Sequence, residues 1–442
     1  RNLAVGNAEG NPYYLEELLK MMLDAGVIEP KPGESDHWRV NPERLEAMRI
    51  PPTLTGILQA RLDSLPRSER ELLQCAAVVG RLFWDAAVSE VSAEERQKVR
   101  ATLDAISGRE MIFWQEHSAF AGTQEYAFKH TLLHDVTYET VLLKLRRDYH
   151  ARTARWLETH AGERISEYAS LIAGHLERAG QAEKAVSYLR QAGERALNTG
   201  AYREALEISR RALGLMSAED AQRVEAIILM GQALIFLCEY EDAGQQLEAA
   251  LRHAQTINEP ATCAKALYFL GMMALDQGDS AQARVYYERS LAAARQAGDQ
   301  ARIARALWGL GWVAIRQGAY APAQEYLVES RAIFEAVGER QGLAGALAGL
   351  SVVAHQGMGD YENAHSLNRQ ALVLAQEIGD RGRVAMTLIN LGEDSRAMGK
   401  YPEAQHYYQE ALDLAQDLGD KLNMVIATAN LGHVAAALHG DS

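Results

Sequence analysis

Small and hydrophobic residues recur with a long period in the second half of the chain. Three series of short motifs repeat there every 40 or 41 residues. The first series is a glycine tetrad, found as AGDQ from Ala297, VGER from Val337, IGDR from Ile378 and LGDK from Leu418. The second is GDSAQA from Gly278, GAYAPA from Gly318, GDYENA from Gly359 and GKYPEA from Gly399, and the third contains Leu-Gly, as in FLGMMA, GLGWVA and NLGHVA. Landmarks at a fixed period predict a stack of similar units.

Each landmark has a role in a pair of packed helices. Glycine after leucine removes a side chain, so that a neighbouring helix can approach, and alanines such as Ala283 and Ala323 let the paired helices pack closely. The glycine of each tetrad ends the second helix, because glycine adopts the left-handed conformation without strain. We therefore expect five complete helix pairs over about residues 220–418 and half a pair up to residue 442.

The first half of the chain has a different pattern. Apolar residues from Leu54 onward form a helical stripe that ends at Pro66, and two more helices fit the residues up to 107. Two strand-like runs follow at 111–117 and 124–130, joined by a Gly-Thr turn. Three helices followed by a hairpin is the order of elements in a winged-helix domain.

Composition and charge narrow the class of protein. The chain has 442 residues and a formal net charge of −14, which argues against a general nucleic-acid binder because such proteins carry a basic surface. Its three cysteines are far apart, which is typical of a reducing compartment. No stretch approaches the roughly 20 apolar residues of a membrane span. We therefore expect a soluble, cytoplasmic protein.

The order of landmarks in the second half resembles the tetratricopeptide repeat, with Leu-Gly early, tyrosine at the turn and alanine in the second helix. The units are about six residues longer than the usual 34. Similar long repeats occur in kinesin light chains and in bacterial signalling ATPases. The resemblance implies a right-handed α-solenoid whose first helices line a concave groove that binds peptides or proteins.

Mapping the family pattern onto this sequence places residues on both sides of each Leu-Gly in the groove, with further residues one turn on. The predicted groove residues are Gln232, Phe236, Phe269, Met272, Asp276, Trp312, Arg316, Gln356, Asn390, Glu393, Asn430 and His433, together with Leu229, Gly309, Gly349, Val352 and Ala397. Asn390 and Asn430 match family positions that hold a peptide backbone, although solvated asparagines are the alternative. For Phe269, Trp308 and Trp312 the alternative is that they fill the core.

Four motifs of the first half resemble the C-terminal part of STAND signalling ATPases of bacteria. In order, they read GNPYYLEELL, IPPTLTGILQARLDSLP, LLQCAAVVG and YAFKHTLLHDVTYE. The resemblance implies that Gly10 and Pro12 belong to a lid that contacts adenine, and that His130 contacts the β-phosphate of bound ADP. The family's Met-His-Asp is Lys129-His130-Thr131 here, so the third position departs from the pattern.

The chain carries no sequence that predicts its own catalysis. It contains no GxxxxGK[ST] loop to cradle phosphates, so we expect no enzyme activity and no bound cofactor in this chain, with ADP or ATP bound only by an intact parent ATPase. We therefore expect the chain to be a fragment of that parent. His130 and His134 have a spacing that can hold zinc, but no third ligand is near, so we expect no metal site.

Together these patterns predict a mainly all-α chain with a small hairpin. Its parts would be a helical lid remnant over 1–50, a winged helix over 51–160, a helical adapter over 161–219 and the repeats over 220–442. The preferred hypothesis is the ligand-sensing arm of a STAND-type ATPase, whose partners are a peptide or protein in the groove and the upstream nucleotide-binding domain.

Two alternatives stay open. The first is a scaffold that holds a protein partner constitutively. The second is a transcription regulator that binds DNA through the winged helix, although residues 54–156 contain 14 Lys/Arg and 14 Asp/Glu and are therefore neutral.

Overall fold

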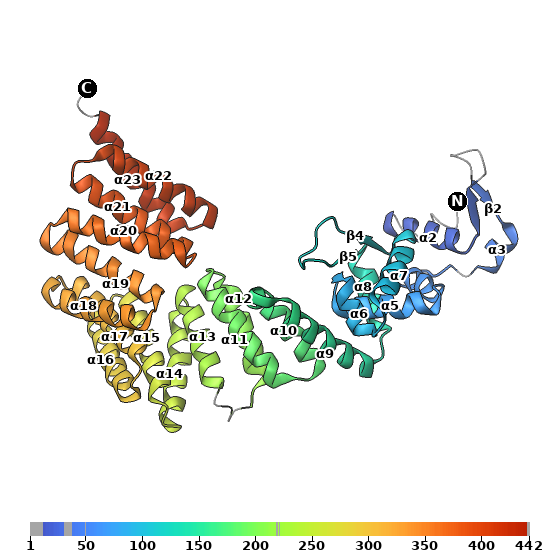
Figure 1. The fold of residues 1–442 in the computed structure, drawn as a ribbon, viewed down its shortest axis with the longest axis horizontal. Helices are drawn as coiled ribbons and strands as arrows, with labels where there is room; N and C mark the ends of the chain where they lie inside the picture. Colours follow the sequence, from blue (N-terminus) through green and yellow to red (C-terminus); the bar gives the residue numbers. More distant parts are fainter. Residues whose placement is uncertain (1–11, 31–37, 49, 218–219, 221, 440–442) are drawn as a thin grey trace. The chain divides into compact units, whose positions relative to one another are not determined.

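The computed structural model describes residues 12–30, 38–48, 50–217, 220 and 222–439. Contacts divide the chain into two compact units, Arg1–Ala192 and Gly193–Ser442. Helices dominate both units, so the predicted all-α fold is confirmed (Figure 1). The predicted site residue Gly10 lies outside the described residues.

The first unit combines short helices with two small sheets. Its elements are α2 (Pro12–Asp24), β1 (Ile28–Pro30), β2 (Trp38–Val40), α3 (Pro42–Ala47), α4 (Leu54–Asp63), α5 (Arg67–Val79), β3 (Leu82–Trp84), α6 (Asp85–Ser92), α7 (Arg96–Gly108), β4 (Ile112–Trp114), β5 (Glu125–Phe128), α8 (Thr131–Glu139), α9 (Leu143–His160), the 3-10 turn η1 (Gly162–Arg164) and α10 (Ile165–Ala179). Helix α11 (Ala182–Asn198) contains the boundary between the two units.

A three-stranded antiparallel sheet lies within the first unit, with β5 between β3 and β4. Strands β4 and β5 are the hairpin that the sequence predicts. Strand β3 and helix α6 were not predicted, because a three-residue strand leaves no alternation to detect. The buried rings of Phe83, Tyr126 and Phe128 pack together on one face of the sheet, so the hairpin contributes to the core.

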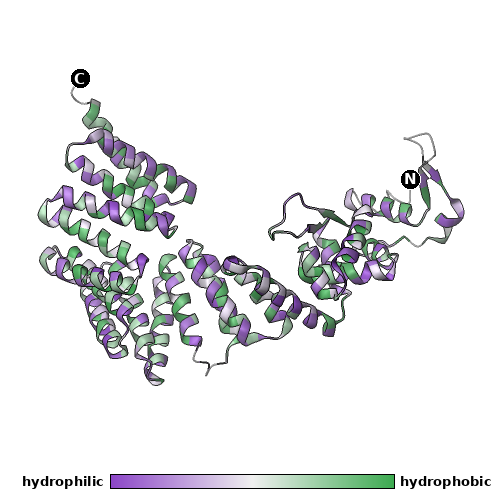
Figure 2. Ribbon diagram, viewed as in Figure 1, coloured by the Kyte–Doolittle hydropathy of each residue, from purple (hydrophilic) through white to green (hydrophobic). Residues whose placement is uncertain are grey.

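The second unit is a solenoid of helix pairs. Its elements are α12 (Tyr202–Leu215), α13 (Arg223–Phe236), α14 (Tyr240–Thr256), α15 (Pro260–Asp276), α16 (Ser280–Ala297), α17 (Gln300–Arg316), α18 (Tyr320–Val337), α19 (Arg340–Val352), the π-helical turn η2 (Val353–Met358), α20 (Tyr361–Glu377), α21 (Arg381–Ala397), α22 (Tyr401–Leu418) and α23 (Lys421–His439). Hydrophobic and hydrophilic residues alternate around these helices (Figure 2). From α13 onward they form the five pairs and the final single helix that the repeats predict.

The glycine tetrads form the turns between repeats. Gly298 ends α16 in the left-handed conformation, with φ of 69°. The next residue, Asp299, caps α17 by accepting a hydrogen bond from the backbone nitrogen of Arg302 at 3.0 Å. Asp380 caps α21 in the same way. One Gly-acid pair therefore ends one helix and starts the next.

The glycines of the Leu-Gly pairs in α15, α17 and α21 each lie against a large side chain of the second helix. A Cβ atom at Gly271 would lie 2.8 Å from the ring of Tyr287, and one at Gly392 would lie 2.5 Å from the ring of Tyr408. Both tyrosines are fully buried. Glycine is therefore required at these positions by the close approach of the two helices.

The fourth helix pair replaces this contact with a buried polar chain. Ser351 occupies the glycine position, and its hydroxyl donates to Oδ1 of Asn368 at 2.8 Å. The Asn368 amide donates to Asp394 at 2.7 Å, and Nδ1 of His355 lies 2.6 Å from the same carboxylate. Burial raises the pKa of Asp394. Each buried polar group thus has a partner, as burial requires.

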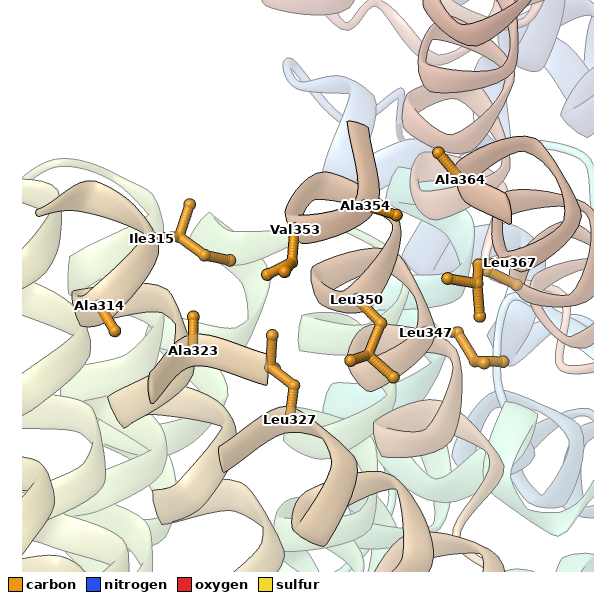
Figure 3. Close-up of a cluster of buried hydrophobic side chains, with 11 residues drawn as sticks. Ala314, Ile315, Ala323, Leu327, Leu347, Leu350, Val353, Ala354, Ala364 and Leu367 are labelled. Atoms are coloured by element: carbon orange, nitrogen blue, oxygen red, sulfur yellow. The ribbon is translucent and has the colours of Figure 1, made fainter. Parts of the chain in front are cut away.

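The π-helical turn η2 accounts for the change from a 40-residue to a 41-residue spacing. Ser351 follows Gly311 by 40 residues, whereas Gly359 follows Gly318 by 41, so the extra residue lies between Ser351 and Gly359. Val353 and Ala354 of η2 join a buried cluster with residues of α17–α20, including Leu327 and Leu350, which lie around them in Figure 3. The insertion is therefore absorbed inside the core.

Among the described residues, no helix combines the length and the apolar character that a membrane span requires.

Two buried histidines connect α8, α9 and α10 in the first unit. Nδ1 of His150 lies 2.8 Å from Nδ1 of His175, and Nε2 of His150 lies 2.9 Å from the hydroxyl of Tyr138. Burial lowers the pKa of His150 to about 3 and that of His175 to about 4. The nearby cations Arg146 and Arg178 act in the same direction.

This pair predicts acid sensitivity of the first unit. Both folded-state pKa values lie below the ordinary value of 6.5, so the unfolded chain binds more protons below pH 6.5. Stability is therefore complete above pH 6.5 and falls as the pH drops toward 4, by about 1.4 kcal/mol per pH unit for each histidine. Urea titrations between pH 7 and 5 should show this slope, and His150→Gln should roughly halve it. An unchanged slope in that variant would contradict the assignment.

Candidate functional site

An aromatic row crosses the first helices of the repeats. Tyr268 of α15 and Trp308 of α17 have ring centroids 6.5 Å apart, and Trp308 and Trp312 are 6.0 Å apart. The two tryptophans are partly buried and pack against core clusters of the solenoid. Burial raises the pKa of Tyr268 to about 12, so this side chain is a neutral phenol at neutral pH.

The two indole N–H groups of this row have no acceptor. Nε1 of Trp308 and Nε1 of Trp312 are buried without a hydrogen-bond partner among the described residues. A Cβ atom at Gly345 of α19 would lie 3.3 Å from Nε1 of Trp308 and 3.5 Å from the guanidinium of Arg383 of α21. The absence of a side chain at Gly345 thus brings groups from three first helices together. An unpaired buried donor costs about 1–3 kcal/mol, so its presence requires an explanation.

A cavity of about 290 Å³ lies beside this row, between α15 and α17. Its lining combines buried residues such as Ala264 and Ser290 with the side chains of Tyr268 and Phe269. The charged lining residues are Lys265, Asp299, Arg302 and Arg305. The cavity lining therefore combines aromatic and small side chains with charged ones.

Several predicted groove residues lie partly or fully exposed on the first helices. Phe236 is 43% exposed and stacks on Tyr202 at 4.6 Å. Burial raises the pKa of Asp276, and Arg316 of the next repeat opposes this effect, so these two predicted residues interact. Glu393 binds Arg396 at 2.6 Å. The remaining members are half-buried (Gln232, Met272, Asn390, Asn430) or exposed (Gln356, His433).

The prediction that residues just before Leu-Gly line the open groove is wrong for two glycines. Gly309 is buried, and a Cβ atom there would lie 2.5 Å from the ring of Tyr287. Gly349 is buried against Leu327. Phe269 is only 5% exposed, although it contributes to the cavity wall. The residue just before Leu-Gly faces the second helix of the preceding repeat. Each residue turns the helix by about 100°, so Gly309 points to a different side of α17 from its neighbour Trp308.

Sequence reasoning missed the residues that surround the cavity. Lys265, Tyr268 and Arg305 were not predicted, although Tyr268 directly precedes Phe269. The available signal was helical spacing, since residues three or four positions apart share one face of a helix. Counting back from Met272 and Trp312 by this spacing leads to Tyr268 and Trp308.

In the first unit, His130 lies beside the start of helix α2. Its ring contacts Tyr13 edge-on, with centroids 5.3 Å apart, and its Nε2 lies 3.8 Å from Oε1 of Glu17. Nε2 of His130 is buried without a hydrogen-bond partner among the described residues. Pro12 is exposed as the first residue of α2. The two described residues of the predicted nucleotide site thus belong to neighbouring elements.

Glu16, Glu17 and His130 have potential metal-ligand atoms within 4.8 Å of one another. Cations already bind both carboxylates: Lys129 lies 2.9 Å from Glu16, and Lys20 and Arg61 bind Glu17. Hydrogen bonds from Lys20 and Lys129 lower the pKa of Glu16 to about 2. The two glutamates of α2 therefore already form ion pairs with cations of other elements, Lys129 and Arg61. This arrangement does not favour a metal ion.

Arg146, near the start of α9, is engaged in contacts within the protein. Arg146 donates to the carbonyl of Val141 at 2.8 Å and to the carbonyl of Glu139 at 2.7 Å, and its guanidinium lies 4.6 Å from the centroid of the Tyr138 ring. These contacts stabilise the turn between α8 and α9 and leave Arg146 poorly placed to bind a phosphate backbone.

Comparison with known proteins identifies the repeats. The tetratricopeptide repeat model matches residues 262–336, 342–417 and 383–442. These segments carry tetratricopeptide repeats. The uncharacterized protein R02095 of Rhizobium meliloti (strain 1021) is 32% identical over 233 residues, which cover 51% of this chain and 21% of that protein. This chain therefore spans a small part of the relative.

Solved structures with tetratricopeptide-like solenoids are similar at low identity. The STAND protein with a tetratricopeptide repeat sensor PH0952 from Pyrococcus horikoshii is 14% identical with a TM-score of 0.44, covering 98% of this chain and 66% of that one. The Rap conjugation gene regulator of the plasmid pLS20, in complex with the Phr* peptide, is 15% identical with a TM-score of 0.44, covering 60% and 77%. At these values neither likeness is evidence about what this chain binds.

Proposed function

We propose that this chain is the signal-sensing arm of a STAND-type signalling ATPase, in which the tetratricopeptide groove binds a peptide or protein. The observation that carries the proposal is the row of Tyr268, Trp308 and Trp312, with two buried indole N–H groups that lack acceptors. A ligand chain entering the groove would supply backbone carbonyl acceptors. Aromatic anchors near the centre of a groove are typical of the residues that dominate binding energy.

The first unit would hold the off state of the parent ATPase. His130, with its unpartnered buried nitrogen beside α2, would contact the nucleotide phosphate, and Gly10 and Pro12 would belong to the lid over the adenine. Signal binding would have to favour the open state, because a ligand with equal affinity for both states shifts no equilibrium.

Removing the Trp312 ring should strongly weaken ligand binding. Immobilised chain, a Trp312→Leu variant and a Val328→Ala control would each be exposed to lysate of the source organism, with retained peptides identified by mass spectrometry and resynthesised. Val328 is 49% exposed on the second helix α18 and offers a matched hydrophobic truncation. We expect the affinity of the resynthesised ligand to fall about 30-fold or more in Trp312→Leu, as for a hot-spot residue.

Equal affinities of the two variants would place the ligand elsewhere on the chain. A partner that binds the ADP and ATP states of the parent equally would identify a scaffold instead of a sensor. Salt-dependent binding of duplex DNA that is lost in Arg147→Ala would favour the regulator hypothesis.

A further inference from the structure

Three exposed leucines surround the start of helix α9. Leu143 is 74% exposed, more than any other large hydrophobic residue that the structure describes, and Leu142 and Leu145 are 70% and 41% exposed. Further along the same helix, the apolar residues Trp156 and Leu157 are buried. The three leucines, here called the leucine tip, therefore lie largely outside the core, and covering them would recover free energy.

The turn that presents the leucine tip is stabilised by Arg146. Its guanidinium donates to the backbone carbonyls of Val141 and Glu139 and lies 3.0 Å from the Glu139 carboxylate. Val141, which directly precedes the tip, is buried. The leucines therefore project from a turn that the protein itself holds in place.

Two cations beside the leucine tip are not neutralised. The acids closest in sequence, Glu139 and Asp148, are each bound by another arginine, at 3.0 Å and 2.8 Å. The exposed side chains of Lys144 and Arg147 form no ion pair with any residue that the structure describes. The tip thus combines apolar and positive surface, although the chain as a whole has a formal net charge of −14.

We propose that the leucine tip, with Lys144 and Arg147, binds the surface of an anionic phospholipid membrane. The leucines would enter the boundary between headgroups and acyl chains, and the two cations would bind lipid phosphates beside them. The contact is peripheral and requires no helix that spans the bilayer. It lies outside the repeat groove and does not depend on the function proposed above.

The arrangement of the leucines distinguishes a membrane from other partners. Successive residues of a helix are about 100° apart, so Leu143 points to a different side of the first turn from Leu142 and Leu145. A partner helix covers one face, with contacts three or four residues apart, and would leave Leu143 in water. Duplex DNA offers mainly phosphates and polar base edges, which cover little apolar surface. A fluid acyl layer surrounds an inserted tip on every side.

Co-sedimentation of the whole chain with vesicles tests this proposal. Vesicles of phosphatidylcholine alone would be compared with vesicles that also contain phosphatidylglycerol. The leucine variant is Leu142→Ser with Leu143→Ser, and the charge variant is Lys144→Gln with Arg147→Gln. All four side chains are exposed, so both variants should keep the urea midpoint of the unmodified chain.

The second unit supplies matched controls for both variants. Leu422 in α23 is 70% exposed, as is Leu142, so Leu422→Ser removes an equally exposed leucine. Arg289 and Arg295 are exposed on α16, so Arg289→Gln with Arg295→Gln removes the same charge as the charge variant.

We expect the unmodified chain and both controls to bind the anionic vesicles and not phosphatidylcholine alone. The charge variant should bind about 30-fold more weakly, because each cation near an anionic surface contributes about five-fold. The leucine variant should bind about ten-fold more weakly or worse, since the burial of leucine side chains supplies the insertion.

Absence of binding to the anionic vesicles would overturn the proposal, as would an equal loss in the controls. A leucine variant that binds as tightly as the unmodified chain would also overturn it, because the attraction would then be electrostatic alone. Fluorescence anisotropy with a labelled DNA duplex and a labelled acidic amphipathic peptide would accompany the vesicle measurements. Binding of either probe that is lost in both variants, with no binding of vesicles, would assign the leucine tip to that class of partner instead.

Discussion

Alanine at Gly309 is expected to lower the free energy of unfolding of the repeats by about 3 kcal/mol, near the upper end of the cost of overpacking a core. The added Cβ would lie 2.5–2.6 Å from three atoms of the Tyr287 ring, which is fully buried. The intrinsic preference of helices for alanine, about 1 kcal/mol, offsets only part of this cost. Native-state hydrogen exchange of amides in α17 would measure the change locally, because solenoids open in parts.

Gly432 supplies the matched control for this prediction. It is also a helix-interior glycine, in α23, but no atom lies within 4 Å of a Cβ built there. Gly432→Ala should therefore be neutral or stabilising by up to about 1 kcal/mol. If both variants behaved alike, helix propensity and not contact with Tyr287 would determine the effect of alanine at Gly309.

Replacing Arg61 with methionine is expected to destabilise the first unit by about 3–5 kcal/mol, since removing one partner of a buried ion pair leaves the other uncompensated. Arg61 and Glu17 are each 1% exposed and bind each other directly. Arg61 also contacts Asp24 at 3.3 Å and donates to the carbonyl of Arg109 at 2.8 Å. Urea unfolding followed by circular dichroism would give the loss, and limited proteolysis should show cleavage in α2 at lower protease concentration.

Two further variants make the ion-pair prediction specific. Arg61→Met with Glu17→Gln should recover much of the loss, because no unpaired charge then stays buried. Arg67→Met removes the exposed pair between Arg67 and Glu71 and should leave the urea midpoint unchanged. A double variant no more stable than Arg61→Met would mean that the arginine acts through packing alone.

The repeats could be predicted from sequence because steric constraints require glycine at several of their recurring positions. The glycine opposite Tyr408 is required by the close approach of two helices, and Gly298 is required by its left-handed backbone conformation. The position of such a glycine in the sequence therefore indicates where helices pack or end. The short strands β1, β2 and β3 have no comparable signal. Three residues are too few to show alternation, and their pairing depends on partners distant in the sequence.

The candidate site was only partly predictable for a related reason. Family spacing led to Trp312 and Arg316, which lie on exposed or half-buried parts of α17. It could not reveal that Trp308 lies against Gly345, because this contact depends on what the neighbouring repeat places opposite. Gln356 was assigned by α-helical counting, but it lies in the π-helical turn η2, where that counting no longer gives the direction of a side chain.

The π-helical turn η2 keeps the helices after it in the same rotational alignment as the helices before it. A residue inserted into a regular α-helix would rotate everything after it by about 100° and turn the groove residues of later repeats away from those before. The wider π turn takes up the added residue within six positions. Beyond it, Gly359 again adopts the left-handed conformation and Ala364 is again fully buried, as in the other repeats. The first helices after η2 therefore continue in step with those before it, and the one change of spacing from α13 onward is taken up within this turn.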